Sequence, residues 1–62
     1  MIRVNGREVK TNFRSGSVME LLKELEICSQ TVVVFRKGRL IPETEMISAE
    51  EEIDVQQVVY GG

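Results

Sequence analysis

The chain has 62 residues and a formal net charge of −2; 42% of its residues are hydrophobic and 29% are charged. A domain of this size buries only about 60% of the surface that its unfolded chain exposes, which argues against a catalytic cleft walled by its own core. There is no His and a single Cys, Cys28, so the commonest general base, an internal disulfide and a Cys-cluster zinc site are excluded. The charge does not favour binding to nucleic-acid phosphates, and no apolar run is long enough to predict a membrane span. We therefore expect one small, soluble, cytoplasmic domain that holds no metal and depends on its hydrophobic core.

Residues 2–9 predict a β-hairpin. The segment Ile2–Val4 is followed by Asn5-Gly6, a pair typical of a two-residue type I′ turn because both positions take positive φ. Such a loop places Ile2 opposite Val9 on one face and Arg3 opposite Glu8 on the other. We expect the second strand to continue through residues 10–12 towards Phe13.

Residues 17–28 predict the only helix. Ser17 is the expected N-cap, and Glu20 stands three residues later, where a capping box places its carboxylate. The apolar residues that follow have the spacing of one helical stripe: Val18, Leu21, Leu22 and Leu25. We expect this helix to end near Ile27 or Cys28.

Residues 31–41 predict a second hairpin. The β-branched and aromatic run from Thr31 to Phe35 is followed by Lys37-Gly38, which offers a turn, and then by residues 39–41. Pro42 ends that strand because it has no N–H to donate to a ladder.

Residues 43–52 are acidic and are expected to be irregular, anchored to the core by Met46 and Ile47, and residues 53–60 predict the last strand. One helix can cover only one face of a sheet, so the order hairpin, helix, hairpin, strand favours parallel first and last strands side by side in the centre. The expected fold is α+β: a β-grasp with a mixed four- to five-stranded sheet and one helix packed across one face. Residues 1–62 then form a single domain with a flexible C-terminal tail from about residue 58.

Three groups of side chains are candidates for chemistry, and each has a simpler structural interpretation. Cys28 is expected to be buried packing, since the chain has no His to activate it. The run 50–52 with Asp54 is expected to be a solvated surface, because consecutive side chains point to different sides and cannot converge on one ion. The basic residues around Gly38 are expected to protect the edge of the sheet, with an acidic partner as the alternative: Arg36, Lys37 and Arg39.

The end of the chain is more informative. Gly61-Gly62 follows three apolar residues directly: Val58, Val59 and Tyr60. An apolar tail that ends in a bare carboxylate suggests a segment that a partner grips, whereas a frayed terminus is the alternative on these residues alone.

Four segments carry a resemblance to a known family over nearly the whole chain. They are Ile2–Gly6, Ser17–Leu22, Leu40–Pro42 and Gln57–Gly62. In these segments the chain resembles the ubiquitin-like sulfur carriers of the ThiS/MoaD family. Its ending is more similar to the thiamine-biosynthesis carriers than to the molybdopterin-synthase small subunits, whose tail usually carries Pro-Pro. One departure is the run 50–52, Glu-Glu-Glu, where the family commonly has an Asp-Gly-Asp turn.

The resemblance implies a protein co-substrate that is not an enzyme and binds no cofactor of its own. A ThiF/MoeB-like adenylating enzyme, which supplies ATP and Mg²⁺, would activate the carboxylate of Gly62, and a sulfur donor would convert it to a thiocarboxylate. The residues before it would thread the partner's active site: Val58, Val59, Tyr60 and Gly61. The sulfur acceptor would be a synthase such as a thiazole synthase, in thiamine thiazole synthesis or a related thiolation. The alternatives are a protein modifier joined through Gly62 to target lysines and an inert β-grasp interaction module.

A partner would also need a docking surface on the domain. In the register we prefer, Val33, Phe35 and Leu40 face the helix. The open face of the sheet then carries an apolar docking patch of Val32, Val34 and Ile41, similar to the exposed sheet patch of ubiquitin. The opposite register instead exposes Val33, Phe35 and Leu40.

Overall fold

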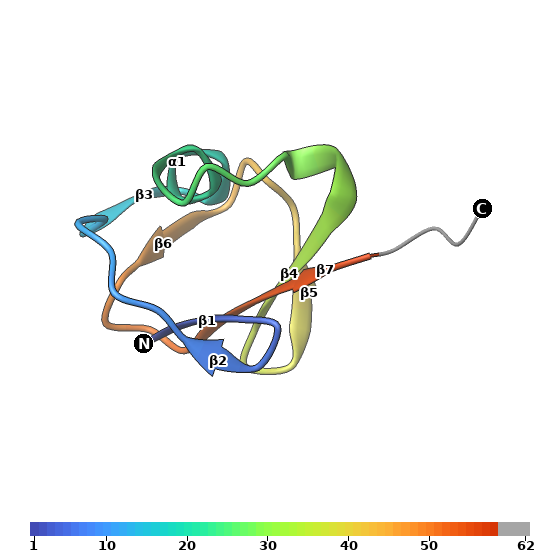
Figure 1. The fold of residues 1–62 in the computed structure, drawn as a ribbon. Helices are drawn as coiled ribbons and strands as arrows, with labels where there is room; N and C mark the ends of the chain where they lie inside the picture. Colours follow the sequence, from blue (N-terminus) through green and yellow to red (C-terminus); the bar gives the residue numbers. More distant parts are fainter. Residues whose placement is uncertain (59–62) are drawn as a thin grey trace.

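The computed structural model describes residues 1–58, which form a five-stranded mixed sheet, a small two-stranded sheet and one α-helix (Figure 1). The larger sheet has the strand order β2-β1-β7-β4-β5, and the smaller one pairs β3 with β6. In chain order the elements are β1 (Ile2–Val4), β2 (Arg7–Glu8), β3 (Ser15–Ser17), α1 (Val18–Glu24), the 3₁₀ helix η1 (Ser29–Thr31), β4 (Val32–Arg36), β5 (Arg39–Ile41), β6 (Met46–Ser48) and β7 (Ile53–Gln57).

Both hairpins have the predicted turns. The φ angles are 52° at Asn5 and 83° at Gly6, and 53° at Lys37 and 78° at Gly38, so each turn has positive φ at both central residues, as type I′ requires. Arg3 pairs with Glu8, as predicted, and Phe35 pairs with Leu40 across the two-residue loop of Lys37-Gly38. β2 ends at Glu8, so the second strand is shorter than predicted and does not continue through residues 10–12.

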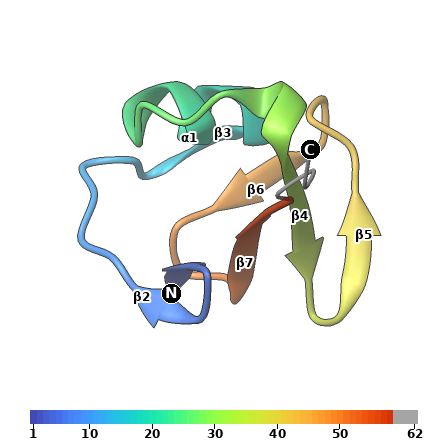
Figure 2. The same cartoon turned by 45° about the vertical axis from the view of Figure 1, so that its right-hand side comes forward.

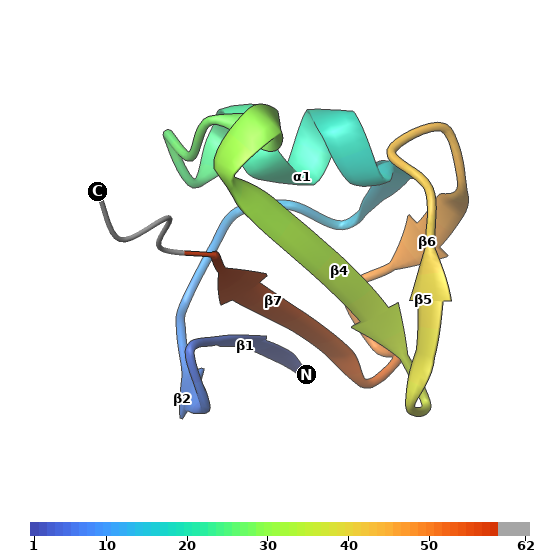
Figure 3. The ribbon, with the colours of Figure 1, turned by 90° about the vertical axis from the view of Figure 1, so that its right-hand side faces the viewer.

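The central pairing is also as predicted. β1 runs parallel to β7, with Ile2 beside Ile53 and Val4 beside Val55, and β4 pairs antiparallel with the other edge of β7. Figures 2 and 3 show α1 on one side of this sheet. The fold is therefore the β-grasp, with β7 at the centre of its sheet.

The helix begins where the sequence predicts and ends earlier. Ser17 is the N-cap, and its Oγ accepts a hydrogen bond from Glu20 N at 3.2 Å. At the other end Glu26 has a φ of 59°, and Ile27 N donates to Leu22 O at 2.9 Å. This bond, with one from Glu26 N to Lys23 O, is a Schellman motif, which closes the last turn and turns the chain away from the axis. The prediction of an end near Ile27 or Cys28 was wrong for this reason.

Residues 43–52 contain a strand that the sequence did not predict. β6 pairs antiparallel with β3, with Gly16 opposite Ile47. Ile47 is buried, as expected, but Met46 is 67% exposed. Adjacent residues of a strand face opposite sides, so only one of the two expected anchors can reach the core.

Arg36 connects this segment to the large sheet. Its Nη2 lies 2.6 Å from Glu45 Oε2, its Nη1 donates to Met46 O at 3.2 Å, and Nη1 also lies 3.7 Å from Glu51 Oε2. Glu51 Oε1 in turn accepts a hydrogen bond from Ser48 N at 2.9 Å. Arg36 and Glu51 therefore tie the acidic segment to the large sheet.

The core lies between α1 and the two sheets. Its buried residues come from β1, α1, β4, β6, β7 and the loop before β3: Ile2, Phe13, Val18, Leu21, Leu22, Val34, Ile47, Ile53 and Val55. Within residues 1–58, no helix is both long enough and apolar enough to cross a membrane.

Candidate functional site

The face of β4 that turns toward α1 is opposite to the one we preferred from the sequence. Val34 is 4% exposed and belongs to the core, and Val32 and Ile41 pack against that core from its margin. The predicted docking patch of Val32, Val34 and Ile41 is therefore wrong. The physical reason is the register: Val34 pairs with Val55, which is fully buried, so both point to the helix.

The open face of the sheet carries the other residues of the same two strands. We call Val33, Phe35 and Leu40 the open-face patch. Val33 lies opposite Gln56 on β7, and Phe35 lies between Asp54 of β7 and Leu40 of β5. Leu40 is 65% exposed. The patch matches the alternative register that the sequence allowed, and its apolar surface lies toward the β5 edge.

The same face becomes ionic toward the β2 edge. The strand pairings place Arg3 beside Asp54 on one side and beside Glu8 on the other, and Arg3 Nη1 lies 3.8 Å from Asp54 Oδ1. An apolar area bordered by opposite charges is the usual anatomy of a surface that binds another protein.

The end of β7 positions the start of the predicted tail. β7 ends at Gln57, and Val58 N donates to Thr31 O at 2.7 Å, one residue beyond the strand. Val58 is partly buried. The other tail residues of the prediction, Val59, Tyr60, Gly61 and Gly62, lie outside the described residues.

An apolar groove between the helix and the β4–β5 hairpin was not predicted. Its volume is about 410 Å³, and its lining includes Val18, Leu22, Val32, Ile41, Pro42 and Glu43. These residues come from segments far apart in the chain, and no local pattern in the sequence brings them together. The groove holds one carboxylate, that of Glu43, so it can bury apolar groups but offers no acid–base pair for catalysis.

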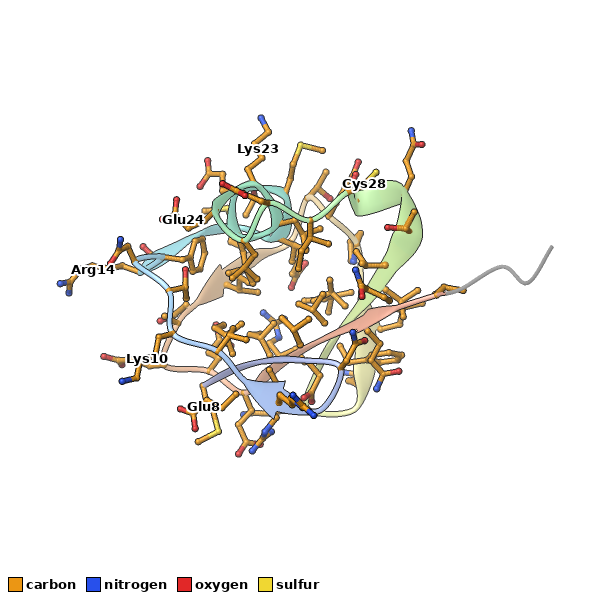
Figure 4. All side chains as sticks on the ribbon, in the orientation of Figure 1. Glu8, Lys10, Arg14, Lys23, Glu24 and Cys28 are labelled. Carbon is orange, nitrogen blue, oxygen red and sulfur yellow. The ribbon has the colours of Figure 1, made fainter. Side chains whose placement is uncertain are left out.

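Cys28 lies on the surface, immediately before η1. Figure 4 shows its side chain pointing outward near the level of the helix. The expectation that it is buried packing was wrong, because the helix ends before it and the chain turns outward there. Among the residues that the structure describes, no group of three His, Cys, Asp or Glu side chains could hold a metal ion.

The fold and this surface define a single-helix β-grasp domain with an apolar patch on its open face, close to the strand that leads to the tail. No model of a known protein family matches the chain, and no curated protein matches it.

Proposed function

We propose that the protein is a sulfur carrier, in which a separate enzyme adenylates the carboxylate of Gly62 and a sulfur donor converts it to a thiocarboxylate. One observation carries the proposal: the central strand of a β-grasp domain ends at Gln57, and the sequence continues through Val58, Val59 and Tyr60 to Gly61-Gly62. The chain is then a co-substrate, acting in the cytoplasm with its activating enzyme. The thiocarboxylate would supply sulfur for thiamine thiazole synthesis or a related thiolation.

The chemistry needs an unhindered terminal carboxylate and little else from this chain. A carboxylate oxygen of Gly62 attacks the α-phosphorus of ATP, and pyrophosphate leaves. The sulfur of a persulfide donor then attacks the acyl carbon, and AMP leaves. Reduction of the resulting acyl disulfide by a thiol releases the thiocarboxylate. Glycine at both last positions suits this path because it has no Cβ and lets the backbone enter a narrow site.

The domain has an apolar surface on which a protein partner could dock. ATP and Mg²⁺ would be supplied by a ThiF/MoeB-like adenylating enzyme, which must hold the domain while the tail reacts, and the persulfide would belong to the sulfur donor. The open-face patch of Val33, Phe35 and Leu40 lies on the side away from the helix, and its Val33 and Phe35 pair directly with the central strand β7. Aliphatic and aromatic side chains of this kind form the cores of protein interfaces.

The test is the intact mass of the protein isolated from its own cells under non-reducing conditions. We expect a species in which one oxygen is replaced by sulfur, located by fragmentation in a C-terminal peptide that ends at Gly62. In reconstitution, the purified protein with an adenylating enzyme, ATP and a persulfide donor should give the same species. Absence of both adenylate and thiocarboxylate with the cognate enzymes would refute the proposal.

The same spectra separate the carrier from a protein modifier. A modifier joined through Gly62 would leave Gly-Gly remnants on lysines of other proteins after proteolysis. Such remnants without any thiocarboxylate would replace the proposed function with that of a modifier, and an unmodified mass alone would leave an inert interaction module.

A further inference from the structure

We propose that Asn5 is a positioning residue that, together with Thr31, fixes the point at which the tail leaves the sheet. The inference rests on the proposed function, because it assigns Asn5 a role in presenting Gly62. It concerns the two residues at the base of the tail, Gln57 and Val58, which the structure describes.

Asn5 holds β7 by three hydrogen bonds. Its main-chain N donates to Val55 O at 2.8 Å, its Oδ1 accepts from Gln57 N at 2.9 Å, and its Nδ2 donates to Gln57 Oε1 at 3.0 Å. Asn5 follows β1 directly and has the positive φ of the turn. Its side chain therefore takes the place of a further β1 residue and extends the parallel ladder along Gln57.

The other edge of the tail base is held by Thr31. Val58 N donates to Thr31 O at 2.7 Å, and Thr31 is itself bonded to Cys28 O through its N and its Oγ1. The main-chain N–H groups of Gln57 and Val58 thus point to opposite neighbours, and each has an acceptor. We call these two bonds, Gln57 N to Asn5 Oδ1 and Val58 N to Thr31 O, the tail clamp.

The clamp sets the length of the tail. Four residues follow Val58 in the sequence, and an extended residue spans at most about 3.3–3.6 Å, so Gly62 can reach about 14 Å from Val58. Release of Gln57 and Val58 would add two residues, or about 7 Å, to this reach. The two freed residues would lose their backbone freedom again when the tail enters the partner, which weakens binding.

The test uses variants at equivalent positions of the two type I′ turns. Asn5→Gly keeps the positive φ and removes both side-chain bonds, while Asn5→Asp keeps an acceptor for Gln57 N. Lys37→Gly is the matched control, because Lys37 has a φ of 53° at the first position of the other turn. The readouts are amide exchange at Gln57 and Val58 by NMR, and the KM and kcat of pyrophosphate release with the adenylating enzyme of the reconstitution.

In Asn5→Gly we expect the amide proton of Gln57 to exchange at least about tenfold faster. We also expect KM to rise about tenfold with kcat unchanged, since the freed residues must be ordered on binding. Asn5→Asp should restore most of both values, and Lys37→Gly should change neither. Unchanged exchange in Asn5→Gly would overturn the clamp, and faster exchange with an unchanged KM would overturn the positioning role. If the unaltered protein is not adenylated, the proposed function fails and the positioning role fails with it, while the exchange data still decide whether Asn5 holds Gln57.

Discussion

At the scale of single residues, Val33 and Val34 are neighbours of the same type with opposite surroundings. Val34 is 4% exposed and packs in the core, whereas Val33 is on the open face opposite Gln56. Truncation to Ala removes the same two methyl groups from each, so the pair isolates the effect of burial.

We predict that Val34→Ala lowers the free energy of unfolding by about 2 kcal/mol and Val33→Ala by less than about 1 kcal/mol. The larger loss combines the transfer of the methyl groups with the cavity that they leave. Denaturant unfolding followed by circular dichroism measures both values. Equal losses would show that β4 presents its two faces equally, contrary to the register with Val55.

This pair also explains why the docking face could not be chosen from the hairpin alone. Residues 32–35 are all apolar, so strand alternation assigns neither face of β4 to the core. The strand that decides is β7, where buried Ile53 and Val55 alternate with Asp54 and Gln56. Choosing the face requires the pairing of β4 with β7, which joins segments about twenty residues apart and is a property of the whole sheet.

At the scale of elements, local chemistry predicted the first turn and the start of the helix better than it predicted the end of the helix. The Asn5-Gly6 turn and the Ser17 cap depend only on residues in immediate contact, and the structure confirms both. The end of α1 depends on Glu26, which takes a positive φ although its side chain favours continuing the helix. No glycine marks the position, so the sequence carries no clear signal for it.

We predict that Glu26→Gly raises the free energy of unfolding by about 0.5–1 kcal/mol, because the steric cost of a Cβ at positive φ, about 1–2 kcal/mol, exceeds the entropic cost of glycine, about 0.5–1 kcal/mol. Lys23→Gly is the control: Lys23 is exposed like Glu26 but lies within α1, where glycine costs about 1 kcal/mol. Thermal and denaturant unfolding should therefore shift in opposite directions for the two variants. A loss of stability in Glu26→Gly would mean that the side chain of Glu26 contributes more than its backbone conformation costs.

At the scale of the whole molecule, the helix-covered face and the open face of the large sheet differ in what they contribute. The helix side supplies the core, and Arg36 holds the acidic segment and β6 to the large sheet from that side. The open face is left with the ion pair of Arg3 and Asp54 and with the open-face patch. A partner that covers this patch can hold the domain without disturbing its core.

The last prediction separates docking from folding with two residues of nearly equal exposure. Leu40 is 65% exposed on β5 in the open-face patch, and Met46 is 67% exposed on β6 in the smaller sheet. A charge at either position remains in water in the free protein, so Leu40→Glu and Met46→Glu should each change the free energy of unfolding by no more than about 0.5 kcal/mol. In a complex that buries the patch, the carboxylate introduced by Leu40→Glu would lose its hydration without gaining a counter-charge. We therefore expect Leu40→Glu to weaken binding to the adenylating enzyme at least about tenfold by calorimetry, with Met46→Glu unchanged. Equal affinities for the two variants would show that the enzyme holds the domain by a surface that does not include Leu40.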